Sequence, residues 1–260
     1  MINLAVIIAR AGSRGLANKS MHPLGGRPLL AWTIEHALGS RLVDHIALTT
    51  DGTDIATVGR KKGLNVYLRP MDLATDCTTI DAAARHGVEC WEVEHGQTAD
   101  RVAIMYANVA LRPTDLTDRA LEKLVETGAD SVQSVYPVGK SHPLWMRTIG
   151  VGKRGQVDVL GMYEPNRIYR RQELPPVYML NAGAIAVTRS SLFNFDPAEP
   201  HAFLGTDRRA IVNEPGDVVD IDSELDLCFA EAILAHRARN PRSNASPIRS
   251  PRSGPDDLAA

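Results

Sequence analysis

The side chains best suited to phosphate chemistry lie in one turn near the amino terminus, which carries Arg10, Arg14 and Lys19 together with Gly12 and Gly15. A glycine-bearing turn after the first strand of an α/β sheet brings backbone N–H groups close to a phosphate. Three cations there can neutralise a triphosphate and the charge that develops on departing pyrophosphate. The alternative is a solvated turn with scattered charges, and these residues alone leave both interpretations open.

Two familiar phosphate loops do not fit this turn. The dinucleotide-binding pattern GxGxxG fails, because Gly12 and Gly15 stand in GxxG spacing. The Walker A pattern GxxxxGK[ST] matches at Lys19-Ser20, but Ser13 and Asn18 occupy its glycine positions. A polyphosphate loop of another type is the interpretation that stays.

Two carboxylates near the other end of the chain suit a metal ion. Asp220 and Asp222 stand two residues apart on an expected strand, so we expect both side chains on one face. Paired carboxylates suit a hard cation such as Mg²⁺, which prefers oxygen ligands and substrate phosphates. The alternative is one solvent-facing Asp beside a helix cap. We favour the metal because the basic turn supplies its expected counterpart.

Strand and helix patterns alternate along most of the chain. The apolar runs typical of strands occupy 3–9, 45–50, 65–68, 102–106, 131–135, 183–187 and 218–222. The patterns typical of helices occupy 28–39, 53–62, 78–95, 117–127 and 223–238, the last opened by Ser223 and Asp226 like a capping box. This alternation predicts an α/β fold with a mainly parallel sheet covered on both faces, which binds ligands at the carboxyl ends of its strands.

Two stretches depart from this alternation. Residues 137–176 are rich in Gly and Pro and predict short strands and loops that leave the sheet. Residues 239–260 mix Pro, Ser and Arg with almost no large apolar side chain, so we expect a disordered tail after a domain spanning 1–238.

Composition excludes several classes of protein. The 260 residues are 44% hydrophobic and carry 29 Lys and Arg against 31 Asp and Glu, which is ordinary for a globular chain and gives no electrostatic argument for nucleic acid. No apolar run approaches the roughly 18 residues of a membrane helix, and the apolar start is expected to be a buried strand and not a signal peptide. Cys77, Cys90 and Cys228 lack metal-ligand spacing, so we expect small buried apolar roles and a reduced cytoplasm.

Five ordered motifs together resemble the acylneuraminate cytidylyltransferases, the family of CMP-sialic acid synthetases. The motifs are the run Ile8 to Gly15 with Lys19 and Leu24-Gly25-Gly26-Arg27-Pro28-Leu29; Thr49-Thr50-Asp51; Leu68-Arg69-Pro70 with Leu73-Ala74-Thr75-Asp76; Arg171 to Pro176 with Asn181-Ala182-Gly183-Ala184-Ile185; and Val219 to Asp226. The resemblance implies a nucleotidyltransferase-type three-layer fold with a Rossmann-like sheet. It also implies that 137–176, where His142-Pro143 resembles the family's opening His-Pro, is a dimerisation excursion.

The resemblance also implies roles for individual residues. Those expected to bind the nucleotide are Ala9, Arg10, Ala11, Gly12, Arg14, Lys19, Arg69 and Thr79. Those expected beside the sugar are Tyr106, Asn108, Arg171, Gln172 and Asn181, with Arg171 facing the sugar carboxylate. The catalytic set would be Arg10, Lys19, Asp220 and Asp222, of which Asp220 and Asp222 would hold Mg²⁺.

Two departures from the family pattern bear on the acceptor. The usual Lys-Asn is Lys19-Ser20, and the usual Gln-Pro-Thr-Ser-Pro-Leu-Arg is the segment from Tyr106 to Arg112. Tyr106 thus replaces a glutamine that faces the acceptor sugar, and Asn108 is expected to take part of that polar role. Because an unpaired buried polar group costs about 1–3 kcal/mol, we expect an altered sugar preference.

The function expected from these residues is transfer of CMP from CTP to a 2-keto-3-deoxy acid sugar, sialic acid or a related nonulosonate, with release of pyrophosphate. The enzyme would be a cytoplasmic, Mg²⁺-dependent homodimer without nucleic-acid or membrane partners. One alternative is 3-deoxy-octulosonate cytidylyltransferase, whose usual Arg-Leu-Pro-Gly-Lys loop and Gln-Gly-Asp-Glu-Pro strand end are absent here. Another is a catalytically inactive nucleotide-binding homologue.

Overall fold

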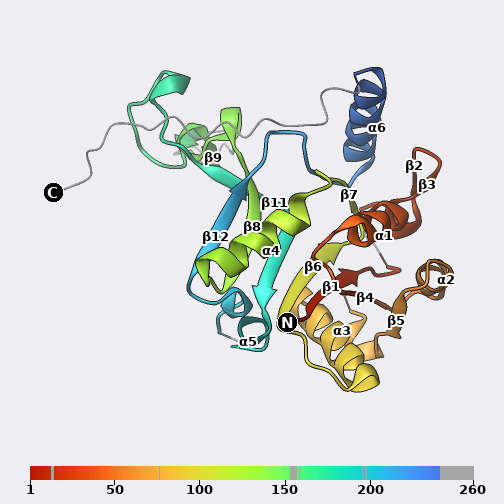
Figure 1. Cartoon of the computed structure of the whole chain (residues 1–260). Helices are drawn as coiled ribbons and strands as arrows, with labels where there is room; N and C mark the ends of the chain where they lie inside the picture. Colours follow the sequence, from red (N-terminus) through yellow and green to blue (C-terminus); the bar gives the residue numbers. More distant parts are fainter. Residues whose placement is uncertain are drawn as a thin grey trace.

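The chain forms a seven-stranded sheet with the strand order β12-β8-β11-β6-β1-β4-β5 (Figure 1). This computed structural model describes residues 1–12, 15–75, 77–152, 157, 159–194, 196 and 198–240. Strand β11 pairs antiparallel with both β6 and β8, whereas the pairs β1–β4, β1–β6, β4–β5 and β12–β8 are parallel. The expected α/β class and mainly parallel sheet are confirmed.

The strands of the main sheet are β1 (Asn3–Ile8), β4 (His45–Thr50), β5 (Asn65–Leu68), β6 (Arg101–Tyr106), β8 (Ser131–Pro137), β11 (Tyr178–Thr188) and β12 (Arg208–Val212). Three two-stranded ladders accompany it: β2 (Pro23–Leu24) with β3 (Arg27–Pro28), β7 (Val109–Leu111) with β13 (Val219–Asp220), and β9 (Arg147–Gly150) with β10 (Val159–Met162). The helices are α1 (Leu29–Gly39), α2 (Thr53–Lys61), α3 (Ile80–His95), α4 (Leu116–Thr127), α5 (Arg189–Leu192) and α6 (Glu224–Arg239).

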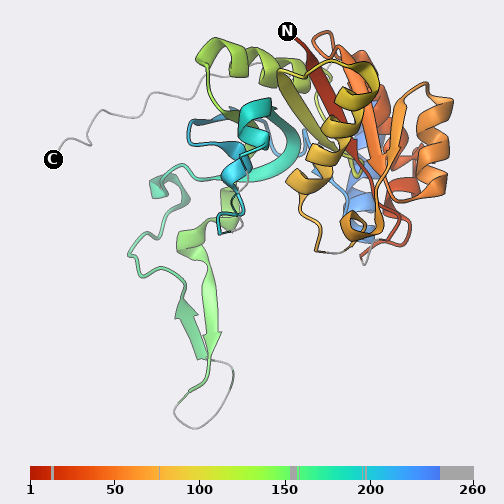
Figure 2. The same cartoon turned by 90° about the horizontal axis from the view of Figure 1, so that it is seen from below.

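Alternation along β1 creates two buried faces and therefore three layers. Leu4 and Val6 pack on one side with the α3 residues Val88 and Trp91. Ala5 and Ile7 pack on the other side with apolar residues of α1 and α2, and α4 covers the β8–β11 part of that side. Figure 2 shows helices on both faces of the sheet. The side chains that hold these layers together are almost all aliphatic, as expected for a sheet buried on both faces.

Most predicted elements lie where the patterns place them, and the capping box of Ser223 and Asp226 opens α6 as expected. The strand predicted at 183–187 is longer, because β11 runs from Tyr178 to Thr188 through a register shift between Leu180 and Ile185. Strands β7 and β12 were not predicted. Both are short and are stabilised by partners distant in sequence.

The segment 137–176 leaves the sheet and projects as an arm made of the β9–β10 hairpin and short helical turns (Figure 2). His142 stabilises the base of the arm. Its Nδ1 accepts a hydrogen bond from the N–H of Leu144 at 3.1 Å, and its Nε2 lies 3.1 Å from the carbonyl of Pro175. Because Nδ1 acts as acceptor, Nε2 carries the proton and donates to Pro175, which joins the two ends of the arm.

The prediction that the three cysteines are buried is wrong for Cys77 and Cys228, which are exposed. Cys90 is half-buried, so it fits the prediction only in part. Cys77 lies in a turn before α3, and Cys228 lies on α6, which buries only Ala230 fully. No helix in the described part of the chain is long and apolar enough to cross a membrane. The tail was predicted at 239–260, but Arg239 is the last residue of α6. The part of the predicted tail beyond residue 240 lies outside the described residues.

Candidate active site

The predicted site residues gather at the carboxyl edge of the parallel strands. The chain leaves β1 at Ala9, leaves β5 at Arg69 and reaches the end of β6 at Tyr106. The strand order reverses between β1 and β6, because β4 and β5 lie on one side of β1 and β6 on the other. Such a reversal opens a crevice at the carboxyl edge, where open α/β sheets bind ligands.

The basic turn meets the acidic pair in this crevice. Strand β13 pairs antiparallel with β7, and the N–H of Ile221 donates to the carbonyl of Asn108 at 3.1 Å, which brings the carboxyl-terminal segment over the end of β6. The Nζ of Lys19 then lies 2.5 Å from Oδ1 of Asp222, although 203 residues separate the two. The two sequence motifs are therefore parts of one site.

Asn108 joins the two carboxylates to each other. Its Nδ2 donates to Oδ1 of Asp220 at 2.5 Å and lies 3.2 Å from Oδ1 of Asp222. Asp222 stands just past the end of β13, so the two Asp side chains converge through Asn108 and not through an extended strand. From the sequence, Asn108 had been expected to face the sugar.

The pKa of the Asp220 carboxyl is raised in this site. Desolvation by the surrounding side chains, and after it the negative charge of Asp222, raise that pKa to about 6, although Asp220 is an exposed residue and the charge of Lys19 opposes the shift. Burial, with the nearby charges of Asp220 and Asp81, raises the pKa of the Tyr106 phenol. Crowded carboxylates of this kind are stabilised when a cation lies between them.

The donor set of the pair fits a hard divalent cation. Asp220 and Asp222 offer carboxylate oxygens, and no cluster of three or more His, Cys, Asp or Glu side chains suited to a metal occurs in the part of the chain that the structure describes. Two carboxylates leave the remaining positions to phosphate and water, which is the arrangement that Mg²⁺ accepts in nucleotide sites.

The first residues of the basic turn are held by neighbouring strand ends. The N–H of Ala11 donates to Oδ1 of Asp51 at 2.9 Å, and Nη2 of Arg69 donates to the carbonyl of Ala9. Arg69 is buried and lies 3.7 Å from Asp51, and burial lowers the pKa of its guanidinium, with a smaller contribution from the charge of Arg10. Asp51 belongs to one of the five sequence motifs, but no role was predicted for it. Its position directly after a buried strand could have indicated that it lies at the site.

The other residues predicted to bind the nucleotide differ in their exposure and in their hydrogen-bond partners. Gly12 is exposed and Arg10 half-buried. Thr79 caps α3, since its side chain accepts from the N–H of Ala82 at 3.4 Å, so its hydroxyl already has a structural partner. Arg14 lies outside the described residues.

Gly15 sets how closely the basic turn approaches the acidic segment. A Cβ at this position would lie 2.5 Å from the backbone oxygen of Asp222. That distance is too short for any side chain, and the obstacle is backbone, so only glycine permits the observed approach.

The predicted sugar residues come from three places. Tyr106 and Asn108 stand at the end of β6, and Asn181 lies buried in β11, where its Oδ1 accepts from the Ser134 hydroxyl at 2.5 Å. Arg171 and Gln172 are exposed on the returning limb of the arm. The described contacts link Asn108 to the acidic pair but do not link Arg171 or Gln172 to it.

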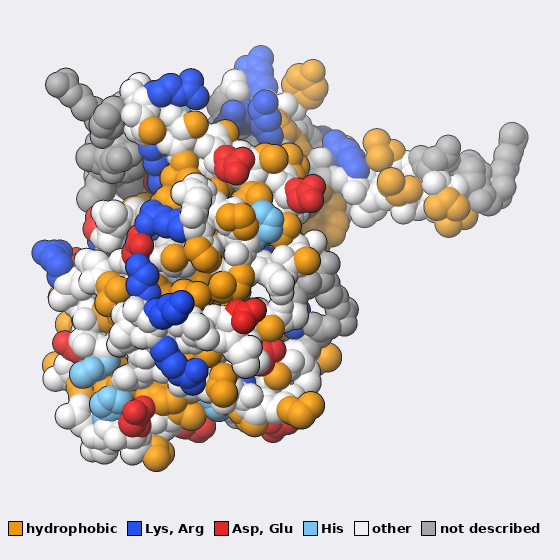
Figure 3. Space-filling view, turned by 90° about the vertical axis from the view of Figure 1, so that its right-hand side faces the viewer, with side chains coloured by type: hydrophobic (Ala, Val, Ile, Leu, Met, Phe, Trp, Pro, Cys, Tyr) orange, Lys and Arg blue, Asp and Glu red, His pale blue; other side chains and the backbone are white. Residues whose placement is uncertain are grey.

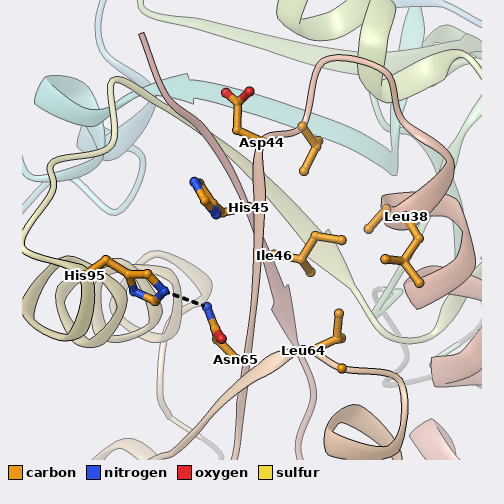
Figure 4. Close-up of a pocket in the computed structure, with 10 residues that line it drawn as sticks. Leu38, Asp44, His45, Ile46, Leu64, Asn65 and His95 are labelled. Atoms are coloured by element: carbon orange, nitrogen blue, oxygen red, sulfur yellow. Dashed lines mark hydrogen bonds between the residues drawn. The ribbon is translucent and has the colours of Figure 1, made fainter.

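A cavity away from this site lies at the amino edge of the strands. It measures about 430 Å³ and opens beside the start of β4, where His45 and Ile46 line it (Figure 4). Nδ2 of Asn65 and Nε2 of His95 lie 3.3 Å apart at its wall. Neither the basic turn nor the acidic pair lines this cavity, so it carries none of the predicted chemistry.

Comparison with known proteins identifies the family of this chain. The family model described as Cytidylyltransferase matches residues 4–149, more than half of the chain. The chain belongs to the cytidylyltransferase family. This result confirms the family-level resemblance, and members of the family are nucleotidyltransferases.

Two curated relatives align with this chain over nearly their whole length. The CMP-N,N'-diacetyllegionaminic acid synthase of Legionella pneumophila is 30% identical over 242 residues, 89% of this chain and 95% of the relative. A pseudaminic acid cytidylyltransferase of Campylobacter jejuni is 28% identical over 240 residues, 90% and 96% respectively. Among solved structures, CMP:2-keto-3-deoxy-manno-octonic acid synthetase complexed with CTP is similar with a TM-score of 0.66 and 16% identity, covering 91% of this chain and all of the other. At that identity the likeness supports the three-layer fold alone.

Proposed function

We propose that the chain transfers the cytidylyl group of CTP to the anomeric hydroxyl of a 2-keto-3-deoxy acid sugar, forming a CMP-sugar and pyrophosphate. The observation that carries this proposal is the contact of Lys19 with Asp222 beside Asn108, which unites a phosphate-binding turn with an acidic pair. Membership of the cytidylyltransferase family supports the choice of nucleotide.

The chemistry follows from charge and position. The anomeric oxygen bonds to the α-phosphorus of CTP, the bond from that phosphorus to the bridging oxygen breaks, and the electron pair leaves on pyrophosphate while the hydroxyl proton passes to water. Arg10 and Lys19 provide positive charge for the departing pyrophosphate, and Arg14 is expected to add to it. Positioning and electrostatic stabilisation account for most of the catalysis in such phosphoryl transfers.

Asp220 and Asp222 are the residues that would hold Mg²⁺. When bound there, the ion polarises the phosphate oxygens and neutralises charge. Asn108 keeps the two carboxylates together, and Lys19 holds Asp222 from the side of the basic turn.

The acceptor we propose is a nonulosonate of the legionaminate, pseudaminate or sialate type. Support comes from the two curated relatives, which are named for legionaminic and pseudaminic acids and align over nearly their full length. On the sugar side we place Tyr106, Asn108, Arg171, Gln172 and Asn181, with the Arg171 guanidinium available for the sugar carboxylate. Tyr106 in place of the family's glutamine is the residue we expect to set the preference among these sugars.

A sugar panel tests the proposal. We expect pyrophosphate release with CTP, Mg²⁺ and one of the three nonulosonates, a rate at least about tenfold lower with UTP, and loss of activity when EDTA removes the metal. Turnover with 3-deoxy-octulosonate alone would contradict the acceptor class. Retained CTP binding without turnover on any sugar would identify an inactive homologue instead.

We also propose that the chain acts as a homodimer through the arm. In the β9–β10 hairpin, Leu160 pairs with Ile149 and shares its face with Met162, and the first two side chains are 68% and 70% exposed. Figure 3 shows apolar side chains along this slender projection. An isolated two-stranded hairpin is marginally stable in water, so an apolar face of this kind gains stability by burial against a second copy.

The substitution Leu160→Asp tests the dimer. We expect it to convert the dimer to monomer in sedimentation velocity at micromolar concentration, because a charge would be buried at the contact. Thr148→Asp is the matched control, since Thr148 is exposed on the opposite face of the same hairpin, and we expect it to leave the dimer intact. A wild-type chain that sediments as a monomer would contradict the proposal.

A further inference from the structure

Arg112, directly after β7, is a buried cation that the mechanism above does not use. The residue is 6% exposed, and no carboxylate of the described residues lies within ion-pair distance of its guanidinium. Its Nε and Nη1 have no hydrogen-bond partner in the described structure. Burial lowers the pKa of this guanidinium to about 10, and only the more distant charge of Asp220 opposes the shift.

A side chain of this kind is costly to retain. Burying a charge without a contacting counter-charge is unfavourable, and an apolar residue of similar volume would often be better tolerated. We therefore looked to the hydrogen bonds that Arg112 does make for the reason that it is retained.

Those contacts all converge on the turn after β6. Nη2 of Arg112 donates to the carbonyl of Val109 and lies 3.3 Å from the carbonyl of Tyr106. The hydroxyl of Thr33, on α1 and fully buried, lies 3.1 Å and 3.2 Å from the same two carbonyls and 3.3 Å from Nη2. Two buried side chains from different elements thus hold both ends of the turn.

Ala107 and Asn108 lie between those ends, and Asn108 is the one that contacts the acidic pair. Its backbone carbonyl accepts from Ile221, and its Nδ2 contacts both carboxylates of the acidic pair. Hydrogen bonds from Thr33 and Arg112 therefore hold the carbonyls on either side of Asn108, and the backbone between those carbonyls carries the amide that contacts Asp220 and Asp222.

We propose that Thr33 and Arg112 are positioning residues, which fix the turn so that Asn108 holds the acidic pair in the geometry that binds a divalent cation. Groups that orient metal ligands from behind typically change metal affinity by about 10–100-fold when removed. This inference depends on the proposed metal role of the pair, and it adds two residues that touch neither metal nor substrate.

The proposal is tested with variants that leave the net charge of the protein unchanged, so that only the hydrogen bonds to the turn after β6 are altered. Thr33→Val removes the hydroxyl at nearly constant shape, Thr33→Ser restores it, and Arg112→Lys keeps the charge but loses the planar fork. Mn²⁺ is titrated into each full-length variant without nucleotide and followed by loss of the free-ion EPR signal. We expect about tenfold weaker binding for Thr33→Val and Arg112→Lys, binding within about twofold of wild type for Thr33→Ser, and, in turnover, a fall in kcat with little change in KM for CTP.

A double-mutant cycle separates positioning from general loss of stability. If Thr33 acts through Asn108, then Thr33→Val weakens Mn²⁺ binding in the wild-type background but not in the Asn108→Ala background. Equal effects of Thr33→Val in both backgrounds would overturn this inference while leaving the proposed function intact. Wild-type Mn²⁺ affinity in both Thr33→Val and Arg112→Lys would do the same. A wild-type chain that binds no Mn²⁺ and turns over no sugar would overturn both.

Discussion

Replacing Asp222 with Asn is expected to lower kcat by about 10²–10³-fold, the scale seen when one preorganised electrostatic group is lost from an active site. The substitution keeps the shape of the side chain but removes the charge that pairs with Lys19 and repels Asp220. It also removes one of the two carboxylates proposed to hold Mg²⁺. Pyrophosphate release at increasing Mg²⁺ is the measurement, and we expect the concentration for half-maximal rate to rise.

The fold should not account for this loss. The Asp222 side chain is 66% exposed, so we expect its urea midpoint to match the wild type. Glu224→Gln is the matched control, because it removes an exposed negative charge two residues away at the start of α6. A kcat within about threefold of wild type for Asp222→Asn would remove the acidic pair from the mechanism.

Gly15→Ala is expected to lower kcat/KM by about 100-fold, because adding one methyl group forces the basic turn away from the Asp222 backbone. A displacement near 1 Å is enough for a loss of that size when catalysis depends on orientation. Steady-state kinetics with CTP and the preferred sugar provide the measurement.

The control for this substitution is Gly39→Ala at the end of α1, where an added Cβ meets nothing within 4 Å. Alanine is preferred over glycine in helices, so we expect unchanged kinetics and equal or slightly higher stability. If Gly15→Ala retained wild-type kcat/KM, the close approach of the turn to Asp222 would not be needed for turnover.

The parts of the fold that follow from local pattern were predictable from the sequence. Short apolar runs placed β1 and β4, and a capping box placed the start of α6. The two halves of the site were also predictable as motifs, because glycines with cations and paired carboxylates suit complementary chemistry.

The way in which those halves meet was not predictable. It depends on the pairing of β13 with β7 across about 110 positions of sequence. A strand was expected over 218–222, but β7 holds only three residues, too few for any periodicity to appear, and no local pattern indicates which strand is its partner. The structural roles of Thr33 and Arg112 were not predictable either. The sequence shows a Thr within an apolar helix, but it does not show which carbonyl groups the hydroxyl of that Thr contacts.

The pairing of β13 with β7 has a consequence for synthesis of the protein. Lys19 leaves the ribosome early, whereas Asp222 emerges only after 203 further residues. A nascent chain can therefore build its nucleotide turn and most of its sheet long before it can assemble a working centre, and any chain released before residue 222 lacks part of the acidic pair however well the rest has folded. Catalytic competence in this protein reports that translation has passed nearly the whole globular region.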